Sequence, residues 1–427
     1  MKVALINTTF LNGGDAAINF GTMRILRRTW GENTEFVCYD SQPDAARRLY
    51  PGIEIRALVF DRVAAEVRYS LPRKFVLLRL LALAFRMGRR TGYSAGKRGP
   101  AVDSGGGFRD RLREYLDADV VVSAGGTYLV DNYRIAPRLF EFLLVLALRR
   151  PLVLFTQSIG PLSGRRDRWI LGWILRRATL VMVRDGRSRR EILALGMPPR
   201  RLAKCPDAAF ALAGGPAGRR PVRKSGNPPR IAISVRDWPF FGGHAEDGME
   251  RYLDAVAGFV RRVVDIDGAK VTLLSSCQGV REYWTDDSTT AARVLRRLPS
   301  HVTPNVVIDG SFLPPDGLIS RLRSFDCVVA TRMHMAILAL CAGRPVIPIA
   351  YEFKTRELFD GLDFDVPVHD IETVRSDDLY AAWRAVERSS AMPEATAAGW
   401  SRVERAHEDA LDSGALVSAA LAGRIPA

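Results

Sequence analysis

The stretch from Asp326 to Lys354, DCVVATRMHMAILALCAGRPVIPIAYEFK, decides the fold of this chain. Its apolar runs predict a buried strand at 325–330, a helix at 335–340 and a second strand at 346–350. A strand, a helix and a strand in this order form a β-α-β unit of a parallel sheet. Ligands of such open sheets bind at the carboxyl ends of the strands. The residues that follow each strand are therefore the first candidates for a functional site.

Charged and aromatic side chains follow both strands. Arg332 and His334 lie at the predicted helix start after the first strand, and Tyr351, Glu352 and Lys354 follow the second. Free N–H groups at a helix start favour an anion, and a planar arginine binds phosphate or carboxylate oxygens bidentately. The simpler alternative is that Arg332 and His334 only cap and solvate the helix. Five such residues at two strand ends favour a ligand site over that alternative.

The same alternation of strands and helices continues along the chain in two blocks. A chain of 427 residues exceeds a single core, so two domains are expected. We predict an N-terminal Rossmann-like domain at 1–212 with a basic insertion at about 60–115, a linker at 213–229 that is rich in Gly, Pro and Arg, and a C-terminal Rossmann-like domain at 230–427 that ends in helices. The predicted fold class is α/β, with two Rossmann-like domains that face a cleft.

Further candidates stand at other predicted strand ends. A structural turn is the alternative for the glycine-containing loops, and a surface ion pair is the alternative for Arg184 and Asp185. The loop Asn12–Asp15 precedes a helix predicted from Ala16, for which Asp15 would be a good N-cap. A turn is predicted at Gly125 and Gly126. Because strand ends of both domains carry such residues, the site is expected in the cleft. The candidates of these strand ends are Gly14, Asp15, Gly125, Gly126, Gln157, Ser158, Arg184, Asp185 and Arg236.

Composition narrows the classes of partner. The net charge of +15 favours phosphorylated ligands, nucleic acid or an anionic membrane surface. No basic motif interleaved with aromatic residues is seen, so nucleic acid is not expected. The five cysteines and five histidines lack the spacing of disulfide or metal sites, and the start MKVALINTTF predicts a strand rather than a signal peptide. We therefore expect a cytoplasmic protein with no bound metal.

One segment, Arg73 to Arg98, carries many basic residues and no acidic one around an apolar run. The run is too short to span a bilayer. It predicts a helix that either packs on its own domain or lies on an anionic membrane surface. The second alternative would place the protein at the inner face of the membrane as a peripheral protein.

Six segments together resemble one known family. They are NGGDAAI at 12–18, SAGG at 123–126, TQSIGP at 156–161, VRDGRSRREILALG at 183–196, CPDAAF at 205–210 and the stretch quoted first. Their order and spacing look like those of the polysaccharide pyruvyl transferase family. This resemblance implies a GT-B-like fold and transfer of a pyruvyl group from phosphoenolpyruvate to a sugar, usually as a ketal. It further implies that Arg184 matches the family's RD motif, and that Arg332 and His334 match its RxH motif for phosphoenolpyruvate binding and catalysis.

The residues suit this chemistry. Ketal formation needs a proton for the enol methylene carbon, and His334 is the natural general acid because imidazole titrates near neutral pH. A carboxylate must accept the hydroxyl proton, and Asp15, Asp185 and Glu352 are all candidates. The acceptor would be a saccharide in a polysaccharide or in a lipid-linked precursor, and no cofactor is expected besides phosphoenolpyruvate as donor. The alternatives are a GT-B glycosyltransferase that uses a nucleotide sugar and a non-catalytic glycan-binding module.

Overall fold

The computed structural model of the chain describes residues 1–66, 73–90, 108–131, 133–214, 227–242, 245–362, 367–391 and 393–423. Most of the predicted linker, at 215–226, and parts of the predicted insertion, at 67–72 and 91–107, lie outside the described residues. The chain divides into two compact units. Unit 1 comprises Met1–Phe10, Gly21–Ala208 and Asp409–Ala427, and unit 2 comprises Leu11–Phe20 and Ala209–Glu408.

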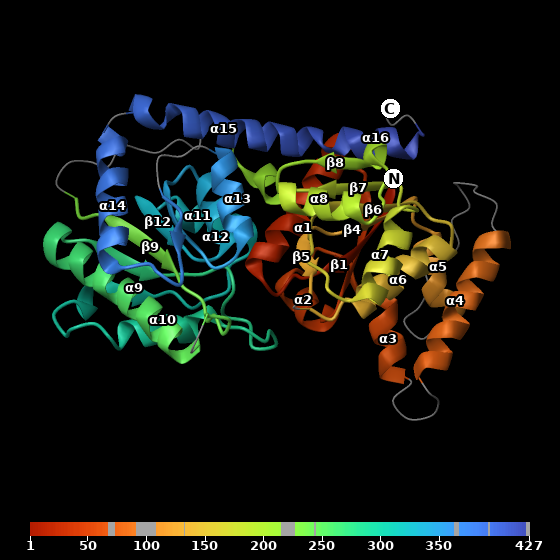
Figure 1. Cartoon of the computed structure of the whole chain (residues 1–427), viewed down its shortest axis with the longest axis horizontal. Coiled ribbons are helices and arrows are strands. Elements are labelled where there is room, and N and C mark those ends of the chain that lie inside the picture. Colours follow the sequence, from red (N-terminus) through yellow and green to blue (C-terminus); the bar gives the residue numbers. More distant parts are fainter. Residues whose placement is uncertain are drawn as a thin grey trace. The chain divides into compact units, whose positions relative to one another are not determined.

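Unit 1 is built on a parallel sheet in the order β3-β2-β1-β4-β6-β7-β8, with β5 paired to β6 (Figure 1). Its middle strands are fully buried and rich in valine and leucine, as expected when helices cover both faces of a sheet. The strands are β1 (Lys2–Thr8), β2 (Glu35–Asp40), β3 (Ile55–Ala57), β4 (Val120–Ser123), β5 (Gly126–Leu129), β6 (Leu152–Ile159), β7 (Leu180–Val183) and β8 (Leu202–Lys204). The helices of the first half of the chain are α1 (Gly13–Trp30), α2 (Pro43–Leu49), α3 (Val59–Glu66), α4 (Arg73–Arg90), α5 (Phe108–Leu116), α6 (Ala136–Ala147), α7 (Arg165–Leu175) and α8 (Gly186–Ala194).

Unit 2 has a parallel sheet in the order β11-β10-β9-β12-β13-β14. The strands predicted to end at Ala330 and Ala350 are β12 and β13, and the predicted helix between them is α12, which begins two residues earlier. The α/β class with two parallel sheets is therefore confirmed. The strands are β9 (Arg230–Ser234), β10 (Lys270–Leu273), β11 (Val306–Ile308), β12 (Cys327–Ala330), β13 (Val346–Ala350) and β14 (His369–Asp370). The helices are α9 (Ala245–Asp267), α10 (Asp287–Leu295), α11 (Pro315–Leu322), α12 (Met333–Cys341), α13 (Phe353–Leu362), α14 (Ser376–Ala391), α15 (Pro393–Asp412) and α16 (Gly414–Leu421).

Two local predictions were wrong. Gly126 begins strand β5, whereas a turn was predicted there, because its backbone pairs with β6 opposite Gln157. Helix α1 begins at Gly13 rather than Ala16. Its cap is Asn12, whose side-chain oxygen accepts the Gly14 N–H at 2.9 Å, and Asp15 lies in the first turn. Asp15 is therefore not the N-cap, and its carboxylate is available for another role.

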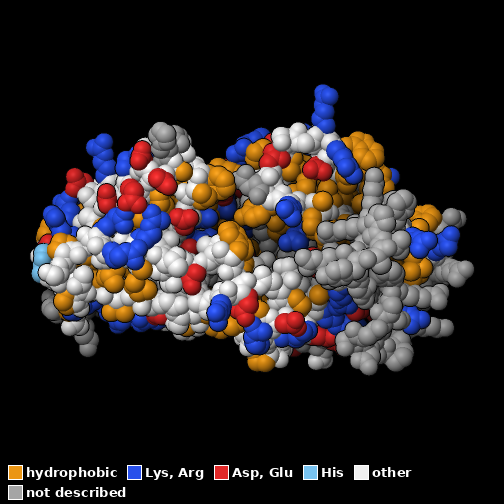
Figure 2. Space-filling view, turned by 90° about the horizontal axis from the view of Figure 1, so that it is seen from below, with side chains coloured by type: hydrophobic (Ala, Val, Ile, Leu, Met, Phe, Trp, Pro, Cys, Tyr) orange, Lys and Arg blue, Asp and Glu red, His pale blue; other side chains and the backbone are white. Residues whose placement is uncertain are grey.

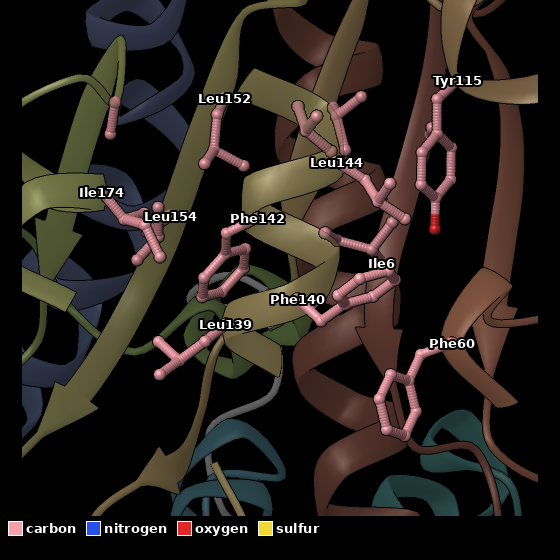
Figure 3. Close-up of a cluster of buried hydrophobic side chains, with 14 of the residues drawn as sticks. Ile6, Phe60, Tyr115, Leu139, Phe140, Phe142, Leu144, Leu152, Leu154 and Ile174 are labelled. Atoms are coloured by element: carbon pink, nitrogen blue, oxygen red, sulfur yellow. The ribbon is translucent and has the colours of Figure 1, made fainter. Parts of the chain in front are cut away.

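The insertion of unit 1 is held on helix α6 by a buried carboxyl group. Glu141 accepts the backbone N–H of Phe60 and the hydroxyl of Tyr115, each at 2.7 Å. Phe60 also packs edge-on against Phe140, with ring centroids 5.6 Å apart. Figure 3 shows Phe60, Phe140 and Tyr115 among the other apolar side chains of this core. Helices α3 and α5 are thus tied to α6 by polar contacts as well as apolar ones.

Helix α4 joins the same core through its middle. Leu80 and Ala84 are buried in the core cluster of unit 1, whereas Arg79, Phe85 and Arg86 are exposed. The described apolar side of this basic helix is therefore used for packing in its own domain. Within the described residues, no helix combines the length and the apolar character needed to cross a membrane.

The buried Glu141 predicts a pH-dependent stability. Burial raises the pKa of Glu141 from 4.5 to about 7, against the opposing effect of its hydrogen bonds from Phe60 and Tyr115. The folded state then keeps a proton that the unfolded state loses, so stability falls as pH rises from 4.5 to about 7 and is level above that window. The loss is on the order of 3 kcal/mol. We expect the variant Glu141→Gln to remove this slope in urea unfolding, whereas Glu32→Gln, at an exposed position, should keep it. Equal slopes in wild type and Glu141→Gln would contradict this account.

Some of the surface charges form ion pairs. Lys and Arg side chains lie among Asp and Glu side chains on the face drawn in Figure 2. In unit 2, for example, Arg293 contacts Glu250 at 3.0 Å and Asp237 at 3.4 Å, and Arg297 contacts Asp254 at 3.0 Å.

Candidate active site

The strand order of unit 2 reverses between β9 and β12, which places a binding crevice outside their carboxyl ends. Arg236 follows β9 within two residues, and Arg332 follows β12 within two residues. Arg332 occupies the extended cap position of α12, and His334 is the second residue of that helix. The β12-α12-β13 unit thus places Arg332 and His334 at the switch point of the sheet, and Arg236 reaches it from the end of β9.

Arg332 is bound by a buried carboxylate. Its Nε donates to Asp287 Oδ2 at 2.8 Å and its Nη2 to Asp287 Oδ1 at 2.6 Å. The Arg332 side chain is 12% exposed and that of Asp287 is 0% exposed. Burial alone would lower the pKa of Arg332, but the charge and hydrogen bonds of Asp287, together with Cys277 and Tyr351, outweigh burial and raise that pKa well above its ordinary value. The Ser275 hydroxyl also donates to Asp287. Arg332 is therefore permanently charged and fixed in one orientation.

Sequence reasoning missed Asp287. It is the second aspartate of Asp286–Asp287, and the side chain of Asp286 caps α10 by accepting the Ser288 N–H. A second acid after the cap predicts only a favourable charge at a helix start. The Nη1 group of Arg332, in contrast, donates to no side chain or carbonyl in the part of the chain that the structure describes. A ligand can therefore use Nη1 while the other edge of the guanidinium stays on Asp287.

The first turn of α1 lies directly against this region within unit 2. The Gly13 N–H donates to the Ser276 carbonyl at 2.7 Å, and a Cβ atom at Gly13 would lie 2.9 Å from that oxygen. A Cβ atom at Gly14 would lie 2.7 Å from Cβ of His334. Glycine is required at both positions because the protein itself approaches so closely. The contact places the start of α1, which carries Asp15, against the start of α12.

The pKa of the Cys277 thiol reports on the charged residues around it. Burial raises the pKa of Cys277 to about 12, and the charges of Arg332 and Arg236 lower it while those of Asp287 and Asp15 raise it. These four charges therefore lie within electrostatic reach of one buried group. The carboxylate of Asp15 is half-buried and forms no hydrogen bond or ion pair with another side chain among the residues described. Its freedom distinguishes it from the paired Asp287.

Arg236 is held by aromatic rings rather than by a carboxylate. Its guanidinium carbon lies 4.1 Å from the ring centroid of Tyr351 and 5.0 Å from that of Trp238. The two rings lie 4.6 Å apart, and Arg236 Nε donates to the Asp237 carbonyl at 3.1 Å. Across the described ranges, no residue accepts a hydrogen bond from its terminal amino groups. Lys354 lies over the same Tyr351 ring at 5.5 Å, and its ammonium pairs with Glu352 at 2.7 Å.

The candidates of unit 1 form a second cluster around Arg184, at the end of β7. Arg184 Nε donates to the Ser158 hydroxyl and Nη2 to the Thr127 hydroxyl, both at 2.8 Å, and Nη1 pairs with Asp207. Only 6% of the Arg184 side chain is exposed. Its ion-pair partner is thus Asp207, which sequence reasoning also missed, rather than the adjacent Asp185.

Asp185 and the remaining candidates of unit 1 have structural partners. Asp185 caps α8 by accepting the Ser188 N–H at 2.6 Å and also accepts the Ser158 hydroxyl at 2.8 Å. Gln157 donates to the Tyr128 hydroxyl at 2.8 Å, and a Cβ atom at Gly126 would lie 2.8 Å from the Tyr128 ring. Gly125 is buried directly before β5. These residues fix the strand ends of unit 1.

The structure thus gathers Gly14, Asp15, Arg236, Arg332, His334, Tyr351, Glu352 and Lys354 in unit 2, and Gly125, Gly126, Gln157, Ser158, Arg184 and Asp185 in unit 1. The two sets come from strand ends of two separate sheets. Asp15, His334 and Arg236 therefore all belong to unit 2.

Comparison with known proteins places the chain in a family. A family model described as polysaccharide pyruvyl transferase matches residues 12–352. The amylovoran biosynthesis protein AmsJ of Erwinia amylovora is 24% identical over 281 residues, which cover 64% of this chain and 66% of that protein. The match therefore spans just under two thirds of the length of this relative.

Solved structures with the same fold include three sugar-nucleotide or sugar-phosphate proteins. HepE of Anabaena in complex with UDP-glucose is 13% identical, with a TM-score of 0.56 and coverage of 99% of this chain and 100% of that chain. Sucrose-phosphate synthase of Thermosynechococcus elongatus gives 12% identity and a TM-score of 0.56 at the same coverage. UDP-GlcNAc 2-epimerase of Neisseria meningitidis bound to UDP-GlcNAc is 9% identical, with a TM-score of 0.55 and coverage of 99% of this chain and 100% of that chain. These similarities confirm the GT-B-like fold.

Proposed function

This chain belongs to the polysaccharide pyruvyl transferase family, and we propose that it transfers the pyruvyl group of phosphoenolpyruvate to hydroxyls of a saccharide, with a ketal as product. The observation that carries the proposal is the packing of the α1 start on His334. The contact is made by Gly14, the residue before Asp15, and the unpaired carboxylate of Asp15 acts on the same buried Cys277 thiol as Arg236 and Arg332. The acceptor saccharide would belong to a polysaccharide or to its lipid-linked precursor.

Arg236 and Arg332 suit the donor because phosphoenolpyruvate carries a phosphate and a carboxylate. Arg236 offers both terminal amino groups, and its stacking on Tyr351 and Trp238 holds the guanidinium plane before any ligand arrives. Such preorganisation reduces the entropy lost on binding. Arg332 contributes Nη1 while Asp287 holds its other edge. We therefore propose Arg236 as the main residue that binds an anionic group of phosphoenolpyruvate.

The reaction then divides between His334 and Asp15. His334 gives a proton to the methylene carbon of the enol, which becomes a methyl group, and positive charge develops on the adjacent carbon. A saccharide hydroxyl attacks that carbon and loses its proton to Asp15. A second hydroxyl of the saccharide displaces the phosphate, which leaves with the remaining proton and completes the ketal. Asp15 is preferred to Asp185 and Glu352 because Asp185 caps α8 and Glu352 pairs with Lys354.

The proposal is tested with the wild-type protein. We expect calorimetry to detect phosphoenolpyruvate binding, and we expect phosphate release when saccharide acceptors are supplied. UDP-glucose is the matched donor control, because proteins of the same fold bind it. Binding of UDP-glucose together with no binding of phosphoenolpyruvate would replace the proposal with glycosyl transfer.

Arg236→Lys is expected to weaken phosphoenolpyruvate binding by about tenfold to a hundredfold, the scale of one or two charged hydrogen bonds. Lysine keeps the charge but loses both the planar fork and the stacking on Tyr351. The measurement is calorimetric titration with phosphoenolpyruvate. Arg251→Lys, at an exposed position of α9, is the control and should bind like wild type. Unchanged affinity in Arg236→Lys would move the donor away from Arg236.

A further inference from the structure

The loop between β10 and α10 presents an indole ring to solvent beside the candidate site. Trp284 is 71% exposed, the highest value among the large apolar side chains that the structure describes. A single exposed ring is not by itself a site, but an indole offers a large rigid apolar face with a polar edge for a ligand. Neither the family match nor the motifs quoted above assign a role to this residue.

The loop that carries Trp284 is firmly anchored. The buried Gln278 accepts the Ser275 N–H at 2.8 Å and donates to the Ser311 carbonyl at 3.0 Å and to the Asp309 carbonyl. Gly279 has φ +70°, and a Cβ atom there would lie 2.5 Å from the Phe312 nitrogen. The Asp287 N–H donates to the Cys277 carbonyl at 2.9 Å and closes the loop. Trp284 is thus exposed on a fixed support, so a ligand that covers it orders little chain.

The same loop is joined to the reacting groups on both sides of Trp284. Tyr283 is half-buried, and its pKa is raised by burial and by the charge of Asp15 against the lowering effect of the Asn12 side chain. Its ring centroid lies 5.6 Å from that of Trp284. Asp287, three residues after Trp284, holds Arg332. The indole therefore lies at the edge of the neighbourhood that contains Asp15 and Arg332.

We infer that Trp284 is the platform on which a pyranose ring of the acceptor saccharide stacks. One face of a pyranose presents mainly C–H bonds, which suit an indole, while the ring's hydroxyls remain at its edge and are free to meet Asp15. The inference rests on the proposed function, since that function makes a saccharide the second substrate. A nonpolar protein partner would instead need a broad apolar patch around the ring, whereas the loop neighbours Arg281, Asp286 and Thr285 are polar.

The test is a binding titration of four proteins: wild type, Trp284→Ala, Trp284→Phe and Trp169→Ala. The ligands are the methyl pyranosides of glucose, galactose, mannose and N-acetylglucosamine, and binding is measured by saturation-transfer NMR. Trp169 on α7 is 68% exposed and is the matched control in unit 1. We expect at least one pyranoside to bind wild type, Trp284→Phe and Trp169→Ala alike, and to bind Trp284→Ala at least about tenfold more weakly. Phosphoenolpyruvate affinity and thermal unfolding should be the same in all four proteins.

Equal pyranoside binding in Trp284→Ala and wild type would overturn the inference, as would failure of wild type to bind any of the four. A change of oligomeric state in Trp284→Ala with unchanged pyranoside binding would assign the ring to a protein interface and overturn it as well. Failure of wild type to bind phosphoenolpyruvate contradicts the proposed function alone. The pyranoside titration alone would then decide whether Trp284 binds a saccharide.

Discussion

Replacing His334 with Ala is expected to lower turnover about a hundredfold, the usual scale for loss of a general acid. The imidazole is the only acid proposed for the methylene carbon, so the loss should appear in kcat for phosphate release. Alanine keeps the Cβ atom against which Gly14 packs, so the start of α1 should stay in place. Thermal unfolding and phosphoenolpyruvate affinity should therefore remain close to those of wild type.

The matched control for this prediction is His301→Ala. His301 is 65% exposed and contacts Asp265 at 3.1 Å, at a surface position of unit 2. Its replacement should leave kcat unchanged. If His334→Ala kept wild-type turnover, protonation of the donor would have to come from another group.

The second large effect is expected on stability. Replacing Asp287 with Ala leaves Arg332 buried without its counter-charge, which typically destabilises a protein by about 3–5 kcal/mol. The guanidinium also loses both hydrogen bonds that fix its direction, so phosphoenolpyruvate affinity should fall as well. Urea unfolding measures the first effect, and calorimetric titration measures the second.

Two further variants distinguish the loss of the buried Asp287–Arg332 ion pair from the general effect of removing a carboxylate at this helix start. Asp286→Ala removes the cap of α10 and a long hydrogen bond from the Gly279 N–H, but no ion pair, and should destabilise by about 1 kcal/mol. The double variant Asp287→Leu with Arg332→Met replaces both charges by apolar groups and should recover most of the stability without recovering donor binding. Asp287→Ala as stable as Asp286→Ala would show that Arg332 finds another partner.

Local pattern was sufficient for the elements around the site. The apolar runs before Arg332 and Tyr351 predicted β12 and β13 correctly, because fully buried parallel strands are short and continuously apolar. The sequence pattern did not predict the first residue of α1 correctly. Gly13 and Gly14 disfavour a helix start by propensity, but their missing side chains let the helix pack on Ser276 and His334, and this tertiary contact outweighs propensity.

The sequence by itself determined the α/β class, the family and the residue types at the strand ends. Only the tertiary structure decided which of the charged residues remain free. Arg332 is neutralised by Asp287, 45 residues away, and Arg184 by Asp207, 23 residues away, whereas Arg236 rests on two aromatic rings. The physical reason is that periodicity records which face of an element is buried, while the partner of a charge depends on which distant segment folds against it.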